Sequence, residues 1–389
     1  MSRKGASRLL AGHPWVYKSD VTEIDAGTSP GALVAVNDER GRFLGSALYS
    51  SSSQITLRLL SPAAVDDLPA LVRERIRVAV AYRKHLVAGS NAYRLVFSEA
   101  DQLPGFIADR YNDVISVQIL TQAMDGPELR QTIIATLLEQ VPEAEHVVER
   151  VDSHIRQLEE LPDLANGLLA GTKTSTTYDM NGLRFQFDGA AGQKTGAFLD
   201  QRENYAVAAG YAHGEALDVC TYQGGFALHM AASKKVAAVT AVDISRPALE
   251  VAEENLALNK RSIGKEIEWI EGNAFDLLKD YSSGGKQYDT IVLDPPAFAK
   301  SKRTLETALR GYKEMNLRAL KMLRPGGILV TCSCSFHVSE AEFLAVLASA
   351  AADAHRAVKI LEKRGAAKDH PAVLTIPETG YLKCIICTV

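Results

Sequence analysis

Long hydrophobic runs are missing from this sequence. No stretch of eighteen apolar residues occurs in the chain, and its basic amino terminus, MSRKGASRLLAGHPWVY, has no apolar segment of the kind that signal peptides carry. Neither export nor membrane insertion is expected, and we predict a cytoplasmic protein. Cysteine is also scarce: the five residues are an odd number gathered toward the carboxyl terminus, which favours reduced thiols over a disulfide framework.

A strong positive charge is missing as well. The formal net charge of -4 does not indicate a nucleic-acid-binding protein overall, because phosphate contacts normally appear as clustered Lys and Arg. Local basic clusters nevertheless occur, namely Arg3, Lys4 and Arg8; residues 73–84; and Lys300, Lys302 and Arg303. Such clusters are more often solvated faces than polyanion sites. The third matters most because it borders the candidate site described below.

The first of three predicted domains covers residues 1–68. Its short strands, VTEI, GALVAVND and RFLGSALYS, are separated by turn residues and predict a small all-β unit. Trp15 and Tyr17 precede these strands, and aromatic residues in such a setting are more often core side chains than platforms for stacking bases.

The second and third predicted domains differ in pattern. Residues 69–188 begin with an amphipathic helix, which we expect from about residue 66 to 87, and continue as an α+β domain with a hairpin turn at Asn112-Asp113. Residues 189–389 alternate strands with helices, which predicts a doubly wound, mostly parallel α/β sheet with its ligands at the carboxyl ends of the strands.

The glycine motif G-x-G-x-x-G is absent from the first strand-to-helix turn of this third domain. The turn instead carries Asp218, Tyr222 and the pair Gly224-Gly225, and the next strand ends at Asp243, whose carboxylate suits ribose hydroxyls. We therefore predict a ligand that contains adenosine without a pyrophosphate, and S-adenosylmethionine is the common one. Alternatively, the two glycines serve packing alone.

The stretch from Tyr288 to His337 carries the candidate chemistry. A buried strand stops at Asp294, two prolines follow, and the next apolar strand ends in Cys332 and Cys334, so a carboxylate and a thiol are expected at the same sheet edge. Carbon 5 of a pyrimidine becomes nucleophilic only after a thiolate adds to carbon 6, and this pairing supplies the thiol.

Each of these residues also has a plainer interpretation. Asp294 either hydrogen-bonds a cytosine edge or caps the next turn, and either cysteine is a nucleophile or a buried small apolar residue. Lys300 and Lys302 are expected to hold phosphates or to lower the pKa of the thiol. Cys384 and Cys387, spaced by three on a predicted strand, are expected to be core residues.

Taken together, six segments resemble one family over essentially the whole chain: GHPWVY, QKTGAFLDQREN, LDVCTYQGGF, LDPPAFAKSK, TCSCS and DHPAVLTIPETGYLK. The chain resembles bacterial large-subunit rRNA cytosine-5 methyltransferases with an N-terminal PUA domain. The resemblance implies a PUA domain, a central α+β domain and a class I methyltransferase domain that forms 5-methylcytosine in 23S rRNA with S-adenosylmethionine. It also makes a homodimer a reasonable expectation.

The resemblance also assigns residues. The T/S-C-S/T signature of the family falls on Cys334, which makes it the preferred nucleophile over Cys332. Asn273 occupies the position that contacts adenine in class I methyltransferases, although Asp276 nearby is an equal candidate for a helix cap. The segment from Gln193 to Arg202 borders the cofactor site in the family, so its polar and aromatic members become site candidates: Lys194, Phe198, Asp200, Gln201 and Arg202. In that set, Lys194 and Arg202 are expected to contact RNA.

Two other functions remain open at this point. A guanine-N2 methyltransferase of related architecture also carries a D-P-P motif but needs no thiol. A ribosome-assembly factor that binds RNA without catalysis would retain the fold, although the presence of Asp218, Asp243, Asp294 and Cys334 argues against it. One departure from the family pattern, Cys220-Thr221, affects only the expected pocket for the methionine moiety.

Overall fold

The first sixty residues form a four-stranded antiparallel sheet with one helix packed against it, in a computed structural model that describes residues 1–190, 196–299 and 301–389. The strand order is β1-β4-β3-β2, with bounds β1 (Trp15–Tyr17), β2 (Leu33–Asn37), β3 (Phe43–Tyr49) and β4 (Ile55–Ser61). The helix is α1 (Arg3–Leu10). A small core lies between helix and sheet, made of Leu9, Val16, Val36, Ala47 and Leu57.

Two expectations for this region are wrong. Residues 21–24 form no strand, because they find no sheet partner and Ile24 stays about half exposed. The sequence predicted only strands in this region, whereas the structure also contains helix α1. It forms because the Ser2 hydroxyl accepts a hydrogen bond from the backbone of Gly5 at the helix start, and because Arg8 in the last turn is paired with Asp20 at 2.8 Å.

The next segment combines three helices with a five-stranded sheet. The sheet has the order β5-β6-β7-β8-β9, and its elements are β5 (Ala92–Phe97), β6 (Phe106–Tyr111), β7 (Val114–Ile119), β8 (His146–Glu149) and β9 (Gly167–Ala170). The helices are α2 (Leu68–Leu86), α3 (Pro127–Gln140) and the shorter α4 (Ser153–Leu158). Both the long helix and the Asn112-Asp113 turn predicted from the sequence are confirmed, since Tyr111 faces Val114 across the turn.

Helix α2 buries more than its apolar side. Val72 and Ile76 are fully buried, as the spacing predicts, but Arg83 is fully buried too. Its guanidinium binds the Asp101 carboxylate at 2.5 Å and the backbone carbonyl of Asp369 at 3.2 Å. This member of the second basic cluster is therefore a structural residue, because its charge is already neutralised inside the protein.

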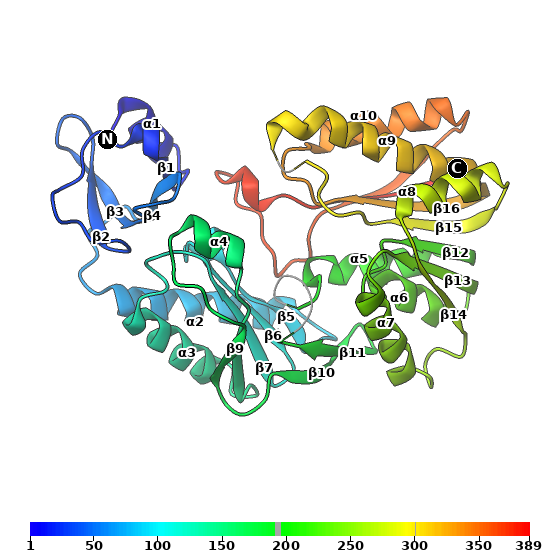
Figure 1. Ribbon diagram of the computed structural model, residues 1–389, viewed down its shortest axis with the longest axis horizontal. Helices are drawn as coiled ribbons and strands as arrows, with labels where there is room; N and C mark the ends of the chain where they lie inside the picture. The colour runs from blue at the N-terminus through cyan, green and yellow to red at the C-terminus, as the bar shows by residue number, and fades with distance from the viewer. Residues whose placement is uncertain (191–195, 300) are drawn as a thin grey trace. The chain divides into compact units, whose positions relative to one another are not determined.

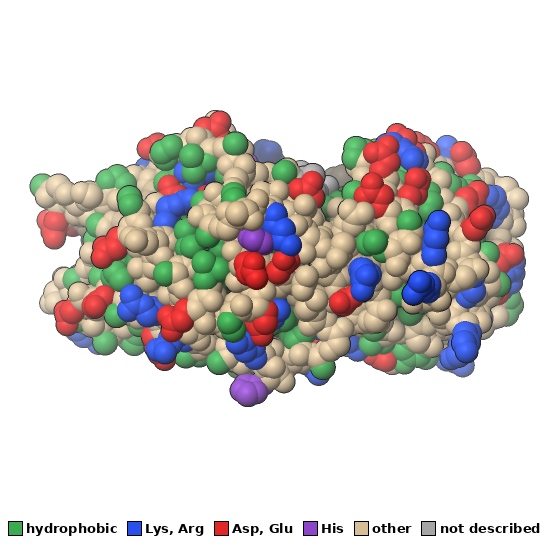
Figure 2. All heavy atoms as spheres, turned by 90° about the horizontal axis from the view of Figure 1, so that it is seen from below, with side chains coloured by type: hydrophobic (Ala, Val, Ile, Leu, Met, Phe, Trp, Pro, Cys, Tyr) green, Lys and Arg blue, Asp and Glu red, His purple; other side chains and the backbone are tan. Residues whose placement is uncertain are grey.

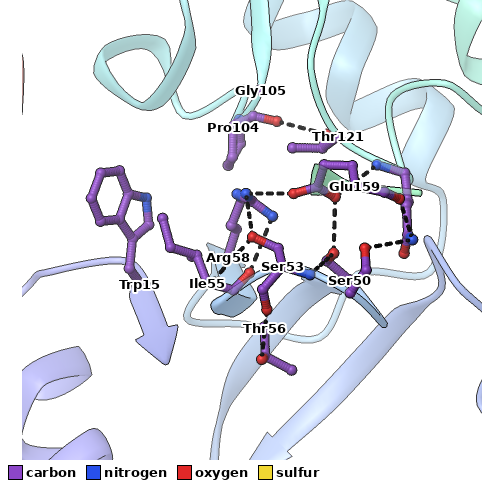
Figure 3. A network of polar contacts seen from close by, with 12 residues as sticks. Trp15, Ser50, Ser53, Ile55, Thr56, Arg58, Pro104, Gly105, Thr121 and Glu159 are labelled. Atoms are coloured by element: carbon purple, nitrogen blue, oxygen red, sulfur yellow. Dashed lines mark hydrogen bonds and ion pairs between the residues drawn. The ribbon is translucent and has the colours of Figure 1, made fainter. Parts of the chain in front are cut away.

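A buried ion pair ties the N-terminal sheet to the segment after α4. Arg58 of β4 donates to the carboxylate of Glu159 at 2.9 Å, and the other oxygen of that carboxylate accepts from the Ser50 hydroxyl at 2.9 Å (Figure 3). Trp15 of β1 makes a second contact with the following segment, because its indole N–H donates a hydrogen bond to Glu99, just after β5, at 2.9 Å. The two parts are thus connected by directional polar contacts.

A seven-stranded sheet organises the carboxyl-terminal half, with the order β14-β13-β12-β15-β16-β18-β17. Its strands are β12 (Gly214–Val219), β13 (Val236–Asp243), β14 (Ile267–Glu271), β15 (Tyr288–Leu293), β16 (Leu323–Ser333), β17 (Lys359–Arg364) and β18 (Lys383–Thr388). The first five strands in this order run parallel, whereas β18 runs antiparallel to them and pairs antiparallel with β17 at the edge of the sheet. The predicted doubly wound, mostly parallel fold is confirmed.

Helices cover both faces of this sheet (Figure 1). On one face lie α5 (Arg202–Tyr211), α6 (Gly225–Ala232) and α7 (Arg246–Leu258). On the other lie α8 (Ala274–Ser283), α9 (Leu305–Met322) and α10 (Glu340–Asp353), whose apolar side chains share one core with β15, β16 and β18. The carboxyl ends of the parallel strands are thus left as the open edge at which such sheets bind ligands.

The contacts between residues divide the chain into two compact units. One comprises Met1–Asp179, Phe187–Leu199 and Lys368–Thr379, and the other comprises Met180–Gln186, Asp200–Ala367 and Gly380–Val389. The two-stranded sheet of β10 (Ser175–Met180) and β11 (Leu183–Asp188) lies where the chain passes from one unit to the other. The domain limits inferred from the sequence stay a prediction. None of the helices in the described ranges is long and apolar enough to cross a bilayer.

Candidate active site

The predicted site residues of the second unit gather at one edge of the sheet. Strand β12 pairs in parallel with both β13 and β15, and β15 pairs with β16. Asp218 and Asp243 lie at the ends of the first two strands, and Asp294 and Cys334 directly follow the last two. Because parallel strands end on the same side, the carboxylates and the thiol share this edge, as the sequence predicts.

Asp218 is a fully buried carboxylate that is only partly satisfied. Its Oδ2 accepts from the Thr221 hydroxyl at 2.6 Å and from the backbone N–H of Ala227 at 2.9 Å. Its Oδ1 has no hydrogen-bond partner among the described residues. Burial raises the pKa of Asp218 to about 7, and the nearby charge of Asp243 acts in the same direction. An unpartnered buried oxygen of this kind marks a place where a polar ligand group fits.

The turn after β12 explains the glycine pair by packing. Gly224 has φ +84°, and a Cβ on Gly225 would lie 2.5 Å from the ring of Tyr205. Both constraints favour glycine for packing, and the predicted contact of this pair with a ligand stays a prediction. Tyr222 also has positive φ, and its backbone N–H donates to Oδ2 of Asp243 at 2.8 Å, which fixes the turn against β13.

Two polar residues and one apolar residue continue this edge. Asp243 accepts from the backbone of Ser245 through its Oδ1 at 2.9 Å. Asn273, rather than Asp276, caps α8, because its Oδ1 accepts from the backbone of Phe275 at 2.9 Å. The capping bond occupies the oxygen and leaves the amide N–H groups of this exposed residue as the donors it offers a base. Ile244, which the sequence analysis missed, is 70% exposed directly after Asp243.

Gln201 is joined to Asp294 by a hydrogen bond. Its side-chain amide donates to Oδ2 of Asp294 at 3.0 Å, and its carbonyl oxygen accepts from Asn204 at 2.7 Å. Asn204 in turn accepts from Arg364 at 2.8 Å. The relation between Gln201 and Asp294 joins η3 (Leu199–Gln201) to the end of β15, and no spacing in the sequence reveals it.

The two cysteines of the TCSCS segment have different surroundings. Strand β16 ends at Ser333, so Cys332 and Cys334 do not share a strand face as a continuing strand would require. Cys332 is fully buried opposite Cys384, and burial together with that second thiol raises its pKa well above the ordinary value. Cys334 is half-buried, and its sulfur lies 3.9 Å from the carbonyl oxygen of Pro295, the residue after Asp294. Cys384 and Cys387 are fully buried, in agreement with their expected core role.

The backbone beyond Cys334 is fixed by side chains that the sequence analysis did not single out. The Ser335 hydroxyl lies 2.9 Å from the Tyr312 hydroxyl and accepts from the backbone of Ala299 at 3.1 Å. The Ser335 carbonyl accepts from the ammonium group of Lys383 at 2.7 Å. These contacts join the loop after the two prolines to the loop that carries the thiol.

One of the residues predicted to contact RNA has its side chain inside the protein. Arg202 is 3% exposed, so its guanidinium is not available for a direct phosphate contact on the surface. Lys194 and Lys300 lie outside the described residues, and Lys302 begins the short helix η4 (Lys302–Thr304). Phe198 is half-buried and belongs to the first unit. Asp200, also from this segment, accepts from the Tyr381 hydroxyl at 2.5 Å.

The site suits a ligand with hydroxyl and amine groups. Asp218 and Asp243 supply acceptors, Asn273 supplies amide donors, and the turn after β12 lacks the glycine spacing that a pyrophosphate requires. These are the groups expected around S-adenosylmethionine. Within the described ranges, no three His, Cys, Asp or Glu residues are grouped so as to hold a metal ion.

Comparison with known proteins places these features in a family. Residues 1–62 match the PUA-like domain, and residues 96–380 match the S-adenosylmethionine-dependent methyltransferase family. A protein named ribosomal RNA large subunit methyltransferase I from Shewanella amazonensis is 38% identical, over 97% of this chain and 95% of its own length. Its counterpart of the same name from Alteromonas mediterranea is 36% identical over the same shares of the two chains.

Solved structures agree on the fold over the full length. The methyltransferase SMU.776, crystallised in complex with SAH, superposes with a TM-score of 0.84 at 19% identity and covers 100% of this chain and 98% of its own. A second structure, of a SAM-dependent methyltransferase from Streptococcus mutans, gives a TM-score of 0.82 at the same identity and coverage. On the match that spans residues 96–380 and on the curated relatives, the chain belongs to the S-adenosylmethionine-dependent methyltransferase family and carries a PUA-like domain ahead of it.

Proposed function

We propose that this protein methylates carbon 5 of a cytosine in large-subunit rRNA and that Cys334 is the nucleophile. The observation that carries the proposal is the position of the Cys334 thiol. It is half-buried, and its sulfur lies 3.9 Å from the carbonyl oxygen of Pro295, which directly follows Asp294 in the chain. An exocyclic amine needs no such thiol, whereas carbon 5 does. The names of the relatives support rRNA of the large subunit as the substrate, and the PUA-like domain supports an RNA.

S-adenosylmethionine supplies the methyl group as an electrophile on its sulfonium. Asp243 is the residue expected to hold the ribose hydroxyls, since its carboxylate oxygens are fixed by backbone N–H groups and retain lone pairs. Asn273 offers its amide donors to the adenine ring, and exposed Ile244 offers an apolar surface to it. The Oδ1 atom of Asp218 is the acceptor for an amine or hydroxyl of the ligand.

The protein residues perform the activation of the base. The Cys334 thiolate adds to carbon 6 of the cytosine, a C–S bond forms, and the electron pair of the 5,6 double bond makes carbon 5 nucleophilic. Asp294, held by Gln201 at 3.0 Å, bonds to the N3 edge and favours protonation there as the thiolate adds. After carbon 5 is methylated, a base such as a water molecule accepts its proton, the C–S bond breaks as the 5,6 double bond re-forms, the thiolate leaves, and N3 returns its proton.

Cys332 does not suit this role. Its side chain is fully buried and faces Cys384, and the neighbouring Asp294 adds to the effect of burial in raising its pKa. A thiol whose pKa is raised is a poor source of thiolate at neutral pH. We therefore assign Cys332 to the packing beneath the Asp294 carboxylate.

The test is methyl transfer to rRNA that lacks the modification, followed by digestion and identification of the methylated nucleoside. Cys334→Ala is expected to abolish 5-methylcytosine while S-adenosylmethionine still binds, measured by calorimetry. Cys332→Ala is the matched control and should retain product formation. Full activity in Cys334→Ala would refute the covalent route, and N2-methylguanosine as the product would replace the proposal by the guanine alternative.

A further inference from the structure

Lys383 is a buried lysine whose ammonium group points at the backbone around the candidate nucleophile. It opens strand β18 and pairs across the sheet with Ser333, the last residue of β16. Its Nζ donates to the Ser335 carbonyl at 2.7 Å and to the Tyr381 carbonyl at 2.7 Å. Cys334 lies between Ser333, which pairs with Lys383 across the sheet, and Ser335, whose carbonyl accepts from Nζ, so the ammonium group binds the backbone next to the thiol.

Two acidic groups interact electrostatically with this ammonium group. They are the Cys334 thiol and the Glu342 carboxylate near the start of α10. Glu342 is occupied in a capping box, where it accepts from the Ser339 hydroxyl at 2.6 Å and from the Ser339 backbone at 2.8 Å. The ammonium group of Lys383 therefore interacts with a carboxylate that already caps α10, as well as with the thiol.

The opposite side of the segment is a neutral hydroxyl pair. Tyr312 of α9 is buried, and its hydroxyl lies 2.9 Å from that of Ser335. Burial raises the pKa of Tyr312, which therefore stays protonated at neutral pH and adds no negative charge of its own. Cys332, two residues before Cys334, stays a neutral thiol because burial raises its pKa well above the ordinary value, and the nearby charge of Asp294 acts in the same direction.

Keeping a lysine here is costly for the fold. Burial lowers the pKa of Lys383 to about 8, so desolvation disfavours the very charge that the side chain carries at neutral pH. A Leu or Met at this strand position would pack without that cost. A buried charge retained next to a nucleophile is the arrangement by which proteins lower a thiol pKa.

We propose that Lys383 is a positioning residue that stabilises the Cys334 thiolate by charge and holds the Cys334-Ser335 backbone through the Ser335 carbonyl. This inference rests on the proposed role of Cys334, and it names a residue about fifty positions away from that nucleophile as part of its activation. Tying the backbone fixes the thiol relative to Pro295, and the adjacent positive charge favours the ionised form.

The experiment measures the ionisation of Cys334 directly, without methyl transfer. The full-length protein is alkylated with iodoacetamide at a series of pH values, and modification of the Cys334 peptide is followed by mass spectrometry. Lys383→Met is expected to raise the pH of half-maximal alkylation by about one unit, which is a roughly tenfold slower reaction at pH 7. Lys383→Arg keeps the charge and should restore most of the rate. Lys363→Met removes an exposed lysine of the adjacent strand β17 and is the matched control.

Two outcomes overturn the proposal: an unchanged alkylation profile in folded Lys383→Met, or an equal shift in Lys363→Met. If Lys383→Met does not fold, the test uses the unsubstituted protein alone. The proposal then requires that the pH of half-maximal alkylation of Cys334 is lower in the native chain than in the chain unfolded in urea. An equal or higher pH of half-maximal alkylation in the native chain refutes the inference. Since no step of this test uses RNA, failure of the proposed methylation would be seen separately, in the nucleoside analysis.

Discussion

The side-chain amide of Gln201 donates a hydrogen bond of 3.0 Å to Oδ2 of Asp294. Asn204 holds the carbonyl oxygen of the same amide at 2.7 Å, so the donor end of Gln201 is fixed toward the carboxylate. One oxygen of Asp294 is thus oriented from within the protein before any base arrives. A pre-oriented carboxylate is what the proposed contact to the cytosine edge requires.

The first prediction concerns this hydrogen bond. Gln201→Leu should lower kcat/KM at least about tenfold, since a hydrogen bond to a charged group contributes roughly 1.5–3 kcal/mol. Steady-state methylation of unmodified rRNA measures it, with thermal unfolding as a check on folding. Gln287→Leu, an exposed glutamine of the same unit, is the control and should leave kcat/KM unchanged. Equal rates in Gln201→Leu and the control would show that Asp294 needs no such support.

The second prediction concerns Asp218 and pH. Burial raises the pKa of Asp218 to about 7 from an ordinary value of 3.8, so the folded state holds this proton more tightly than the unfolded state. The corresponding stability is fully present below about pH 4 and is lost as pH rises to about 7. Relative to Asp218→Asn, the unsubstituted protein should therefore lose a few kcal/mol of unfolding free energy across this range.

Urea unfolding at several pH values measures that difference. Asp276→Asn is the matched control for the substitution itself, since this residue is exposed in the first turn of α8. If the difference in unfolding free energy between Asp218→Asn and the unsubstituted protein does not change with pH, the raised pKa of Asp218 is contradicted. A slope of the opposite sign would mean that the carboxylate is stabilised in its charged form.

The third prediction concerns the ion pair of Figure 3. Arg58→Met leaves Glu159 as a buried charge without its partner and should destabilise the protein by about 3–5 kcal/mol. Urea unfolding followed by tryptophan fluorescence is a direct readout, because Trp15 lies in the same unit. Arg77→Met, which breaks an exposed pair with Glu74, should change the free energy of unfolding by less than about 1 kcal/mol. Similar effects of the two substitutions would disprove the structural role of Arg58.

The fourth prediction concerns RNA binding by the N-terminal domain. The face shown in Figure 2 mixes basic and acidic side chains, whereas a surface hollow on α1 is lined by Arg3, Lys4, Ser7, Arg8 and Ala11. Arg8 is paired with Asp20, so the exposed Arg3 and Lys4 are the expected phosphate contacts. Arg3→Ala with Lys4→Ala should weaken rRNA binding and flatten its salt dependence by about one unit per lost contact.

Filter binding at a series of salt concentrations measures both quantities. Lys279→Ala, an exposed lysine of α8, is the control and should keep the affinity and the slope. An unchanged salt slope in the α1 variant would place the phosphate contacts elsewhere on the protein.

Local sequence signals predicted the strand ends of the site well. The apolar runs stop at Asp243 and Asp294 because a helix cap or a proline follows, and such signals act over a few residues. Helix α1 escaped the prediction because eight residues with two buried apolar side chains give a weak period.

The partners of the candidate residues could not be predicted in this way. Lys383 meets the Cys334 segment only because β18 inserts antiparallel beside β16 with a particular register, and Gln201 meets Asp294 only after η3 folds back to β15. The glycine pair shows the same limit, since the close approach of the Tyr205 ring to Gly225 leaves no signal in the sequence, and the predicted contact of the pair with a ligand stays a prediction. Contacts over tens to hundreds of residues leave no local period or motif.

The chain crosses between its two units five times, in six alternating segments, and the last segment is Gly380–Val389 with strand β18 inside it. No single cut in the polypeptide therefore releases either unit intact: removing residues after Ala367 would take a central strand from one sheet and Lys368–Thr379 from the other unit. On a ribosome, neither unit can be completed until almost the whole chain has been synthesised, which makes late-stage assembly of the nascent protein sensitive to truncation.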